Sequence, residues 1–112
     1  MNLSSETIGV NIGLVRLTGR LDAAVSERVK STLKKLVDNG HSNIIVDLEA
    51  VPFIDSSGLA SLVSGLRLAR EQGGNVVLSG IQPQAQTVFR LTMLDLVFSI
   101  QPTLDDAKRS LI

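Results

Sequence analysis

The sequence predicts an α/β domain with a mixed, mostly parallel sheet, an N-terminal β-hairpin and about four helices. Strand-like and helix-like patterns alternate along the chain in the order β-β-α-β-α-β-α-β-α, which is typical of helices that cover a largely parallel sheet. Of the 112 residues, 44% are hydrophobic and only 3% are aromatic, so the core is expected to be aliphatic. This length suits one domain that spans residues 1–112.

The chain opens with a predicted hairpin and a helix. Residues 6–18 contain two β-like runs, and Asn11 and Gly13 between them suit a hairpin connection. Asp22 follows at a position where its carboxylate can accept hydrogen bonds from the free N–H groups of a helix. That helix is predicted over residues 23–38, where apolar side chains recur at helical spacing.

The rest of the chain repeats the strand–helix alternation. Its first strand is apolar on both faces and is therefore expected near the centre of the sheet. The predicted elements are residues 43–48, 57–71, 75–79, a short helix that begins at Pro83, residues 96–100, and a terminal helix after Thr103. The inward-facing positions expected in the short helix are Ala85, Val88, Phe89 and Met93. Thr103 begins a pattern like a capping box, with Asp106 where Glu or Gln is usual.

The composition argues against several classes of function. Lys plus Arg and Asp plus Glu number 11 each, so no overall field favours nucleic acid or an anionic membrane. The absence of cysteine excludes disulfides, thiolate metal sites and thiol catalysis. Neither a signal-peptide pattern nor an apolar run near the ~18 residues of a membrane span is present. We therefore expect a cytoplasmic protein with no membrane span and no direct contact with nucleic acid.

The most informative stretch is VPFIDSSGLASLV, residues 51–63. An apolar run ends at Ile54, and the DSSG segment (Asp55–Gly58) follows before a helical pattern begins. This handover lies at the carboxyl end of a predicted strand, where open α/β sheets place their sites. Asp55 or Ser56 can serve as the N-cap of the helix. A cap alone does not account for a second serine.

Enzymatic interpretations of the DSSG segment find little support. The nucleophile elbow Gly-x-Ser-x-Gly would need glycine where Ile54 stands. The single histidine, His41, is predicted in a loop at the opposite end of the sheet, so no histidine base accompanies the serines. A lysine base stays open, although no Ser-x-x-Lys motif occurs. No phosphate-binding loop occurs, and a metal site built from Asp47, Glu49 and Asp55 would be unspecific. We therefore expect no enzyme activity, no cofactor and no metal.

A phosphorylation switch accounts for more of the pattern. The macrodipole and the free N–H groups at a helix N-terminus stabilise a phosphate on a serine there. The fold would tolerate the modification, whereas a partner docked over the same place would meet about two added negative charges.

The helix after the DSSG segment has one apolar side and one side of small residues. The predicted buried stripe is Leu59, Leu62, Val63, Leu66 and Ala69. The opposite side, called the small-residue face below, consists of Ser57, Ala60, Ser61, Ser64, Gly65 and Leu68. Either a second layer of the same domain or a partner protein covers this face. In the second case Leu68 is a candidate contact, and Ser61 and Ser64 permit close packing around it.

Two segments carry a resemblance to a known family. Phe53–Leu59 resembles the signature of STAS domains, specifically of anti-sigma factor antagonists, and Leu17–Asp22 resembles the turn after their second strand. In that family the serine after the motif aspartate is phosphorylated by the anti-sigma factor, itself a serine kinase. The unphosphorylated antagonist binds the anti-sigma factor and frees the sigma factor, and a PP2C-type phosphatase restores it.

The resemblance implies a STAS-like fold with Ser56 as the phosphate acceptor. It also implies that Asp22, Asp55, Ser57, Gly58 and the start of the following helix, including Ala60, meet the kinase, flanked by the turn Gly80–Pro83. The sequence departs from the pattern at Thr92–Leu94, Thr-Met-Leu where many relatives have Ser-Gly-Leu, which we expect to alter the end of the third helix. The alternative function is a constitutive STAS subunit of a signalling scaffold or a lipid-transport complex.

Overall fold

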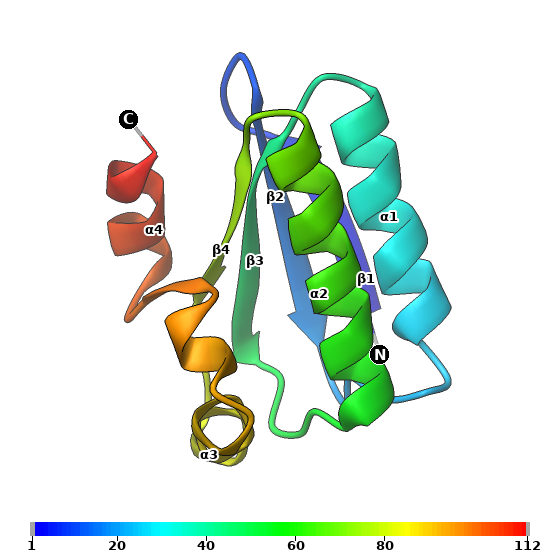
Figure 1. Ribbon diagram of the computed structural model, residues 1–112, viewed down its shortest axis with the longest axis vertical. Coiled ribbons are helices and arrows are strands. Elements are labelled where there is room, and N and C mark those ends of the chain that lie inside the picture. Colours follow the sequence, from blue (N-terminus) through cyan, green and yellow to red (C-terminus); the bar gives the residue numbers. More distant parts are fainter. Residues whose placement is uncertain (1, 112) are drawn as a thin grey trace.

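The computed structural model describes residues 2–111, which fold as an α/β sandwich around one sheet (Figure 1). Strands and helices alternate as the sequence predicts. The elements are β1 (Asn2–Thr7), β2 (Ile12–Thr18), α1 (Ser26–Asp38), β3 (Asn43–Ala50), α2 (Ser56–Glu71), β4 (Asn75–Ser79), α3 (Pro83–Leu91), the 3₁₀ turn η1 (Leu94–Leu96), β5 (Ser99–Gln101) and α4 (Leu104–Ser110).

The sheet is mixed and mostly parallel, as predicted. Its strand order is β1-β2-β3-β4-β5, with β1 antiparallel to β2 and every other pair parallel. The central strand β3 pairs Val46 with Val15 on one side and with Leu78 on the other. It is therefore an inner strand of the sheet, as predicted.

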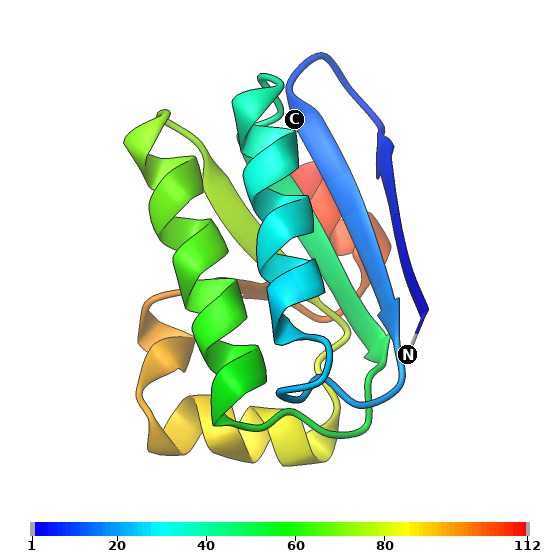
Figure 2. The same ribbon diagram turned by 90° about the vertical axis from the view of Figure 1, so that its right-hand side faces the viewer.

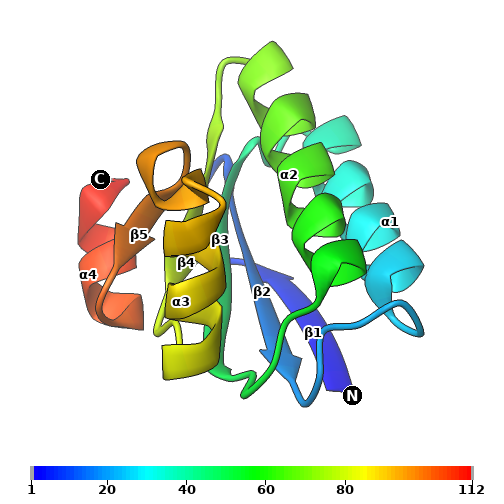
Figure 3. The same ribbon diagram turned by 60° about the horizontal axis from the view of Figure 1, so that its bottom comes forward.

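Helices cover both faces of the sheet, and α3 lies across its lower end (Figures 2 and 3). Helices α1 and α2 pack on one face over the larger core, to which β3 contributes Ile44, Val46 and Leu48. On the other face α4 covers a smaller cluster that contains Ile45 and Ala107. Alternate residues of β3 thus belong to different cores because successive side chains of a strand point to opposite faces. Among residues 2–111, no helix is both long and apolar enough to cross a membrane.

Several predicted boundaries were wrong at the ends of elements. Strand β1 begins at Asn2 rather than near residue 6, and Gly13 lies inside β2 rather than in the connection. Helix α1 begins at Ser26 instead of residue 23 because Asp22 closes a turn: its carbonyl oxygen accepts from the amides of Val25 and Ser26. The side chain of Asp22 accepts from Ala24 N at 3.1 Å and does not cap the helix.

The segment after α3 also differs from its prediction. Residues 96–100 were predicted as a strand, yet β5 covers only Ser99–Gln101 and η1 precedes it. Met93 was expected to face inward but is 64% exposed, because its φ of 59° turns the chain out of the helix. The predicted cap of the terminal helix is confirmed, since Thr103 Oγ1 accepts from Asp106 N at 3.1 Å.

Candidate functional site

The two sequence motifs lie side by side at the carboxyl end of the sheet. Leu21 N donates to Phe53 O at 2.9 Å, and Asp55 N donates to Leu21 O at 3.1 Å. These bonds form a parallel bridge between Leu21 and Ile54, both fully buried. The loop that carries Asp22 is thereby held against the DSSG segment.

Gly58 permits this close approach. A β-carbon at this position would overlap the carbonyl oxygen of Leu21 and would lie 2.7 Å from its Cγ. The glycine of the DSSG segment is therefore required by packing between the two loops, in addition to any role in the turn.

Asp55, one of the two predicted candidates, caps α2. Its backbone is extended, with φ −103° and ψ −176°, and its Oδ1 accepts from Gly58 N at 2.9 Å. Ser56 is the first residue of the helix and is exposed, whereas Ser57 is half-buried. Within residues 2–111, neither the hydroxyl nor the amide of Ser56 donates a hydrogen bond. The Ser56 hydroxyl is thus accessible beside N–H groups that can receive an anion.

Gln84 of α3 fixes the strand-like segment just before the cap. Its Oε1 accepts from Ile54 N at 2.9 Å, and its Nε2 donates to Ile54 O at 3.0 Å. The side-chain amide therefore pairs with Ile54 as a neighbouring strand would. Sequence analysis missed Gln84, since a glutamine in the first turn of a helix carries no signal of such a long-range contact.

Arg20 adds a cation to the same surface. Its guanidinium lies 4.0 Å from the centroid of the Phe53 ring, and its Nε is 3.9 Å from Asp22 Oδ2. Contacts of this kind hold the planar guanidinium over the ring. Asp22, a predicted site residue, is thus brought close to the DSSG segment with a partly exposed carboxylate.

The small-residue face is only partly open, and Ser61 lies on its covered part. Ser61 is 3% exposed, and its hydroxyl donates to Gly58 O at 2.6 Å. A β-carbon on Gly65 would meet the Leu33 side chain of α1, so α1 covers this part of the face. Leu68 is half-buried and packs against the core. At Ser61, Gly65 and Leu68 the face is therefore covered by the domain itself and not left open for a partner protein.

The accessible side of α2 is rotated toward η1. Ala60 is exposed, Ser64 is half-buried, and Val63, predicted in the buried stripe, is 39% exposed. These residues line a shallow hollow of about 420 Å³ with Ser56, Leu59, Arg67 and Leu94. A second hollow, between the first turns of α1 and α2, is lined by Ser26, Glu27, Lys30, Ser57, Ala60 and Ser61. The surface beside Ser56 thus contains two hollows, one on each side of the first turns of α2.

The candidates considered for enzymatic chemistry lie apart. His41 is in the loop between α1 and β3, at the end of the sheet opposite the start of α2 (Figure 1). Asp47 Oδ1 accepts from Glu49 N at 3.1 Å and lies 3.5 Å from Ser79 Oγ. Across the described part of the chain, no group of three or more His, Asp or Glu side chains is placed to hold a metal ion.

Comparison with known proteins identifies the family. The family model of the STAS domain matches residues 5–107, and the chain belongs to this family. One relative, an anti-sigma F factor antagonist of Paenibacillus polymyxa, is 28% identical over 99 residues, which cover 88% of this chain and 82% of the relative.

Solved structures agree with the fold. An anti-sigma factor antagonist from Mycobacterium paratuberculosis superposes with a TM-score of 0.85 at 25% identity, covering 97% of this chain and 92% of that protein. The Bacillus cell fate determinant SpoIIAA, in its phosphorylated form, superposes with a TM-score of 0.80 at 21% identity over 99% of this chain and all of that one. At such identity the second likeness concerns the fold alone.

Proposed function

We propose that this protein is an anti-sigma factor antagonist controlled by phosphorylation of Ser56. The unphosphorylated form binds a serine-kinase anti-sigma factor, which then releases its sigma factor. The observation that carries the proposal is the exposed Ser56 hydroxyl at the first residue of α2, directly after the Asp55 cap. The names of relatives such as the Paenibacillus polymyxa antagonist support it.

Electrostatics explain how a phosphate would act at this place. It adds about 1.5 to 2 negative charges, which the N-terminus of α2 and its unused amides stabilise. The domain itself therefore stays folded. Asp22 and Asp55 lie on either side of the bridge between Leu21 and Ile54, so a phosphate on Ser56 adds its charge beside two carboxylates, and a partner that fits the unmodified surface is repelled by this additional charge.

The proposed binding surface extends from the Asp22 loop along the accessible side of α2. Asp22, Asp55, Ser57, Ala60 and Ser64 have exposed or half-exposed positions there. Gly58 and Ser61 contribute by shaping the turn from below, since both are buried, and Leu68 lies at the covered margin.

In this proposal the partner proteins carry out the chemistry and the antagonist only binds. The partner kinase supplies ATP and the chemistry, a PP2C-type phosphatase removes the phosphate, and the antagonist needs no catalytic groups or cofactor. Ser56 supplies only an accessible hydroxyl.

A combined binding and phosphorylation experiment tests the proposal. Wild type, Ser56→Ala, Ser56→Asp and the matched control Ser31→Asp are used as baits in extract of the source cells; Ser31 is an exposed serine of α1 that lines a different hollow. We expect wild type, Ser56→Ala and Ser31→Asp to retain a protein that Ser56→Asp loses. The retained protein, purified with ATP and Mg²⁺, should phosphorylate wild type at Ser56 and leave Ser56→Ala unmodified. Phosphate on Ser57 instead would overturn the assignment of the acceptor.

The second candidate function is a constitutive STAS subunit in a larger assembly. It is favoured by exposed apolar side chains near η1, namely Val63, Leu91, Met93, Leu96 and Val97. Equal capture of one partner by Ser56→Ala and Ser56→Asp, without phosphorylation, would establish this function in place of the switch.

A further inference from the structure

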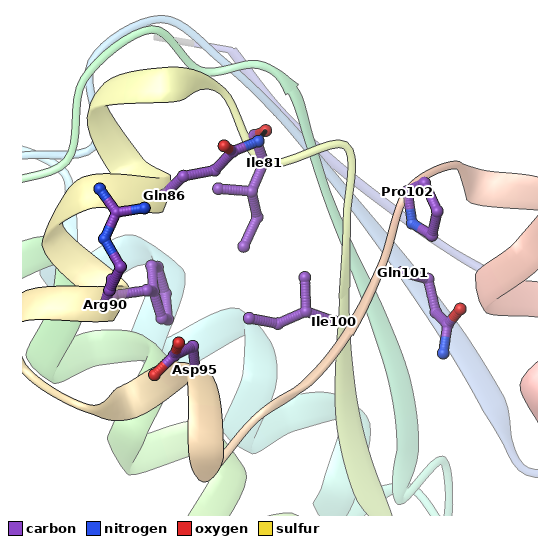
Figure 4. A pocket seen from close by; sticks show the side chains of 8 residues that line it. Ile81, Gln86, Arg90, Asp95, Ile100, Gln101 and Pro102 are labelled. Carbon is purple, nitrogen blue, oxygen red and sulfur yellow. Dashed lines mark hydrogen bonds between the residues drawn. The ribbon is translucent and has the colours of Figure 1, made fainter.

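A third hollow lies at the carboxyl ends of β4 and β5, and Figure 4 shows the side chains that line it. Its volume is about 470 Å³. It is called the α3 hollow below, and its lining residues are Ile81, Gln86, Phe89, Arg90, Asp95, Ile100, Gln101 and Pro102. Carboxyl ends of parallel strands are the usual place for ligands in open α/β sheets, and this volume is within the range of small-molecule sites.

The floor of the α3 hollow is apolar and held in place. Phe89 and Ile81 are buried and Ile100 is half-buried. The Phe89 ring packs edge-on against Phe98, with centroids 5.6 Å apart and planes at 81°. Gln86 Nε2 donates to Ile81 O at 2.9 Å and ties α3 to the loop after β4. The cavity is therefore formed before any ligand arrives.

Two opposite charges stand at the mouth without partners. Within residues 2–111, the side chains of Arg90 and Asp95 make neither an ion pair nor a hydrogen bond, although both line the same hollow. By contrast, Arg109 and Asp106 contact each other on α4. Figure 4 shows Arg90 and Asp95 on one side of the hollow, Gln101 on the other and Ile100 between them.

We propose that the α3 hollow binds a free α-amino acid with a large aliphatic or aromatic side chain. The Arg90 guanidinium pairs with the carboxylate, Asp95 pairs with the ammonium group, and the side chain packs against Ile100 above the buried Ile81 and Phe89. A guanidinium suits a carboxylate because it can donate two parallel hydrogen bonds. A carboxylic acid without an amino group would bring its carboxylate close to the carboxylate of Asp95. An amine without a carboxylate would bring its ammonium group close to the guanidinium of Arg90. A zwitterion satisfies both.

This site is separate from the proposed switch at Ser56, so each can fail without the other. The test is a titration of the ¹⁵N-labelled protein with L-leucine, in which the amide chemical shifts are monitored by NMR. We expect saturable shifts in α3, η1 and β5, with a dissociation constant in about the millimolar range, because Arg90 and Asp95 are exposed to solvent and their ion pairs with the ligand are weak. L-serine has both charges but no apolar side chain, and 4-methylpentanoate has no ammonium group. Both should bind at least about tenfold more weakly.

Variants of Arg90 and Asp95 test which charged group of the ligand each side chain binds. Arg90→Gln should weaken leucine binding about tenfold or more, because a charge-assisted hydrogen bond is lost. Asp95→Asn should abolish the preference for leucine over 4-methylpentanoate. The matched control is Arg67→Gln, which changes an exposed arginine of a different hollow and should leave binding unchanged. Absence of saturation with leucine, equal shifts with serine, or equal weakening by Arg67→Gln would overturn the proposal.

Discussion

The carbonyl oxygen of Leu21 occupies the space that a β-carbon on Gly58 would need. The same oxygen accepts from Asp55 N at 3.1 Å. One main-chain group thus joins the two motifs, aligns the residue that caps α2 and limits the position after Ser57 to glycine.

Gly58→Ala should therefore destabilise the domain by roughly 2 kcal/mol, since added atoms in a packed region force the backbone apart. Urea denaturation followed by circular dichroism measures the change. Gly73→Ala is the control: space around it is open, and only its φ of 79° penalises a side chain, by roughly 1 kcal/mol. A smaller loss for Gly58→Ala than for Gly73→Ala would contradict the packing argument.

Gln84→Ala should lower the free energy of unfolding by roughly 2 kcal/mol, because it leaves the N–H and C=O of the buried Ile54 without their partners. Hydrogen exchange should show the Ile54 amide losing protection. Gln72→Ala serves as control, because Gln72 is an exposed residue after α2 whose side chain makes no such bond. Unchanged exchange at Ile54 in Gln84→Ala would argue that the segment is held by Leu21 alone.

Met93→Gly should stabilise the domain by roughly 1 kcal/mol, since a left-handed backbone is unfavourable for a residue with a β-carbon. The φ of Met93 is 59°, and its exposed side chain contributes little packing. Thermal unfolding measures the gain. Met93→Ala retains the β-carbon and should show no comparable increase; an equal increase would assign the effect to loss of the exposed side chain.

Asp106 should give α4 a pH-dependent contribution to stability. Hydrogen bonds from Arg109 and Thr103 hold the pKa of its carboxyl below the ordinary value of 3.8. Because the pKa is lower in the folded protein, the contribution is fully present well above pH 3.8 and is lost as the pH falls through the folded pKa.

The measurement is urea unfolding of wild type and Asp106→Asn as the pH falls. Their difference in stability should shrink as the pH drops below 3.8. A difference between wild type and Asp106→Asn that does not vary with pH would assign the effect to helix capping alone.

Much of the local structure could be predicted because its signals lie close together in the chain. The strand Asn75–Ser79 follows from a short apolar run between turn residues, the helix start at Pro83 from the fixed φ of proline, and the Asp55 cap from a short-range hydrogen bond. The candidate Ser56 site follows from the same handover from strand to helix. The predicted boundaries of helices were wrong in two places. At Asp22 a turn forms where the first turn of α1 was predicted, and at Met93 a left-handed residue ends α3.

The sequence by itself determined the α/β class, the order of elements and the strand-to-helix handover that contains Ser56. Only the tertiary structure decided that α1 covers Ser61 and Gly65, that Gln84 pairs with Ile54, and that Arg90 and Asp95 share one hollow. The physical reason is distance along the chain. Periodicity and capping act over a few residues, whereas these contacts depend on how separate helices cross the sheet.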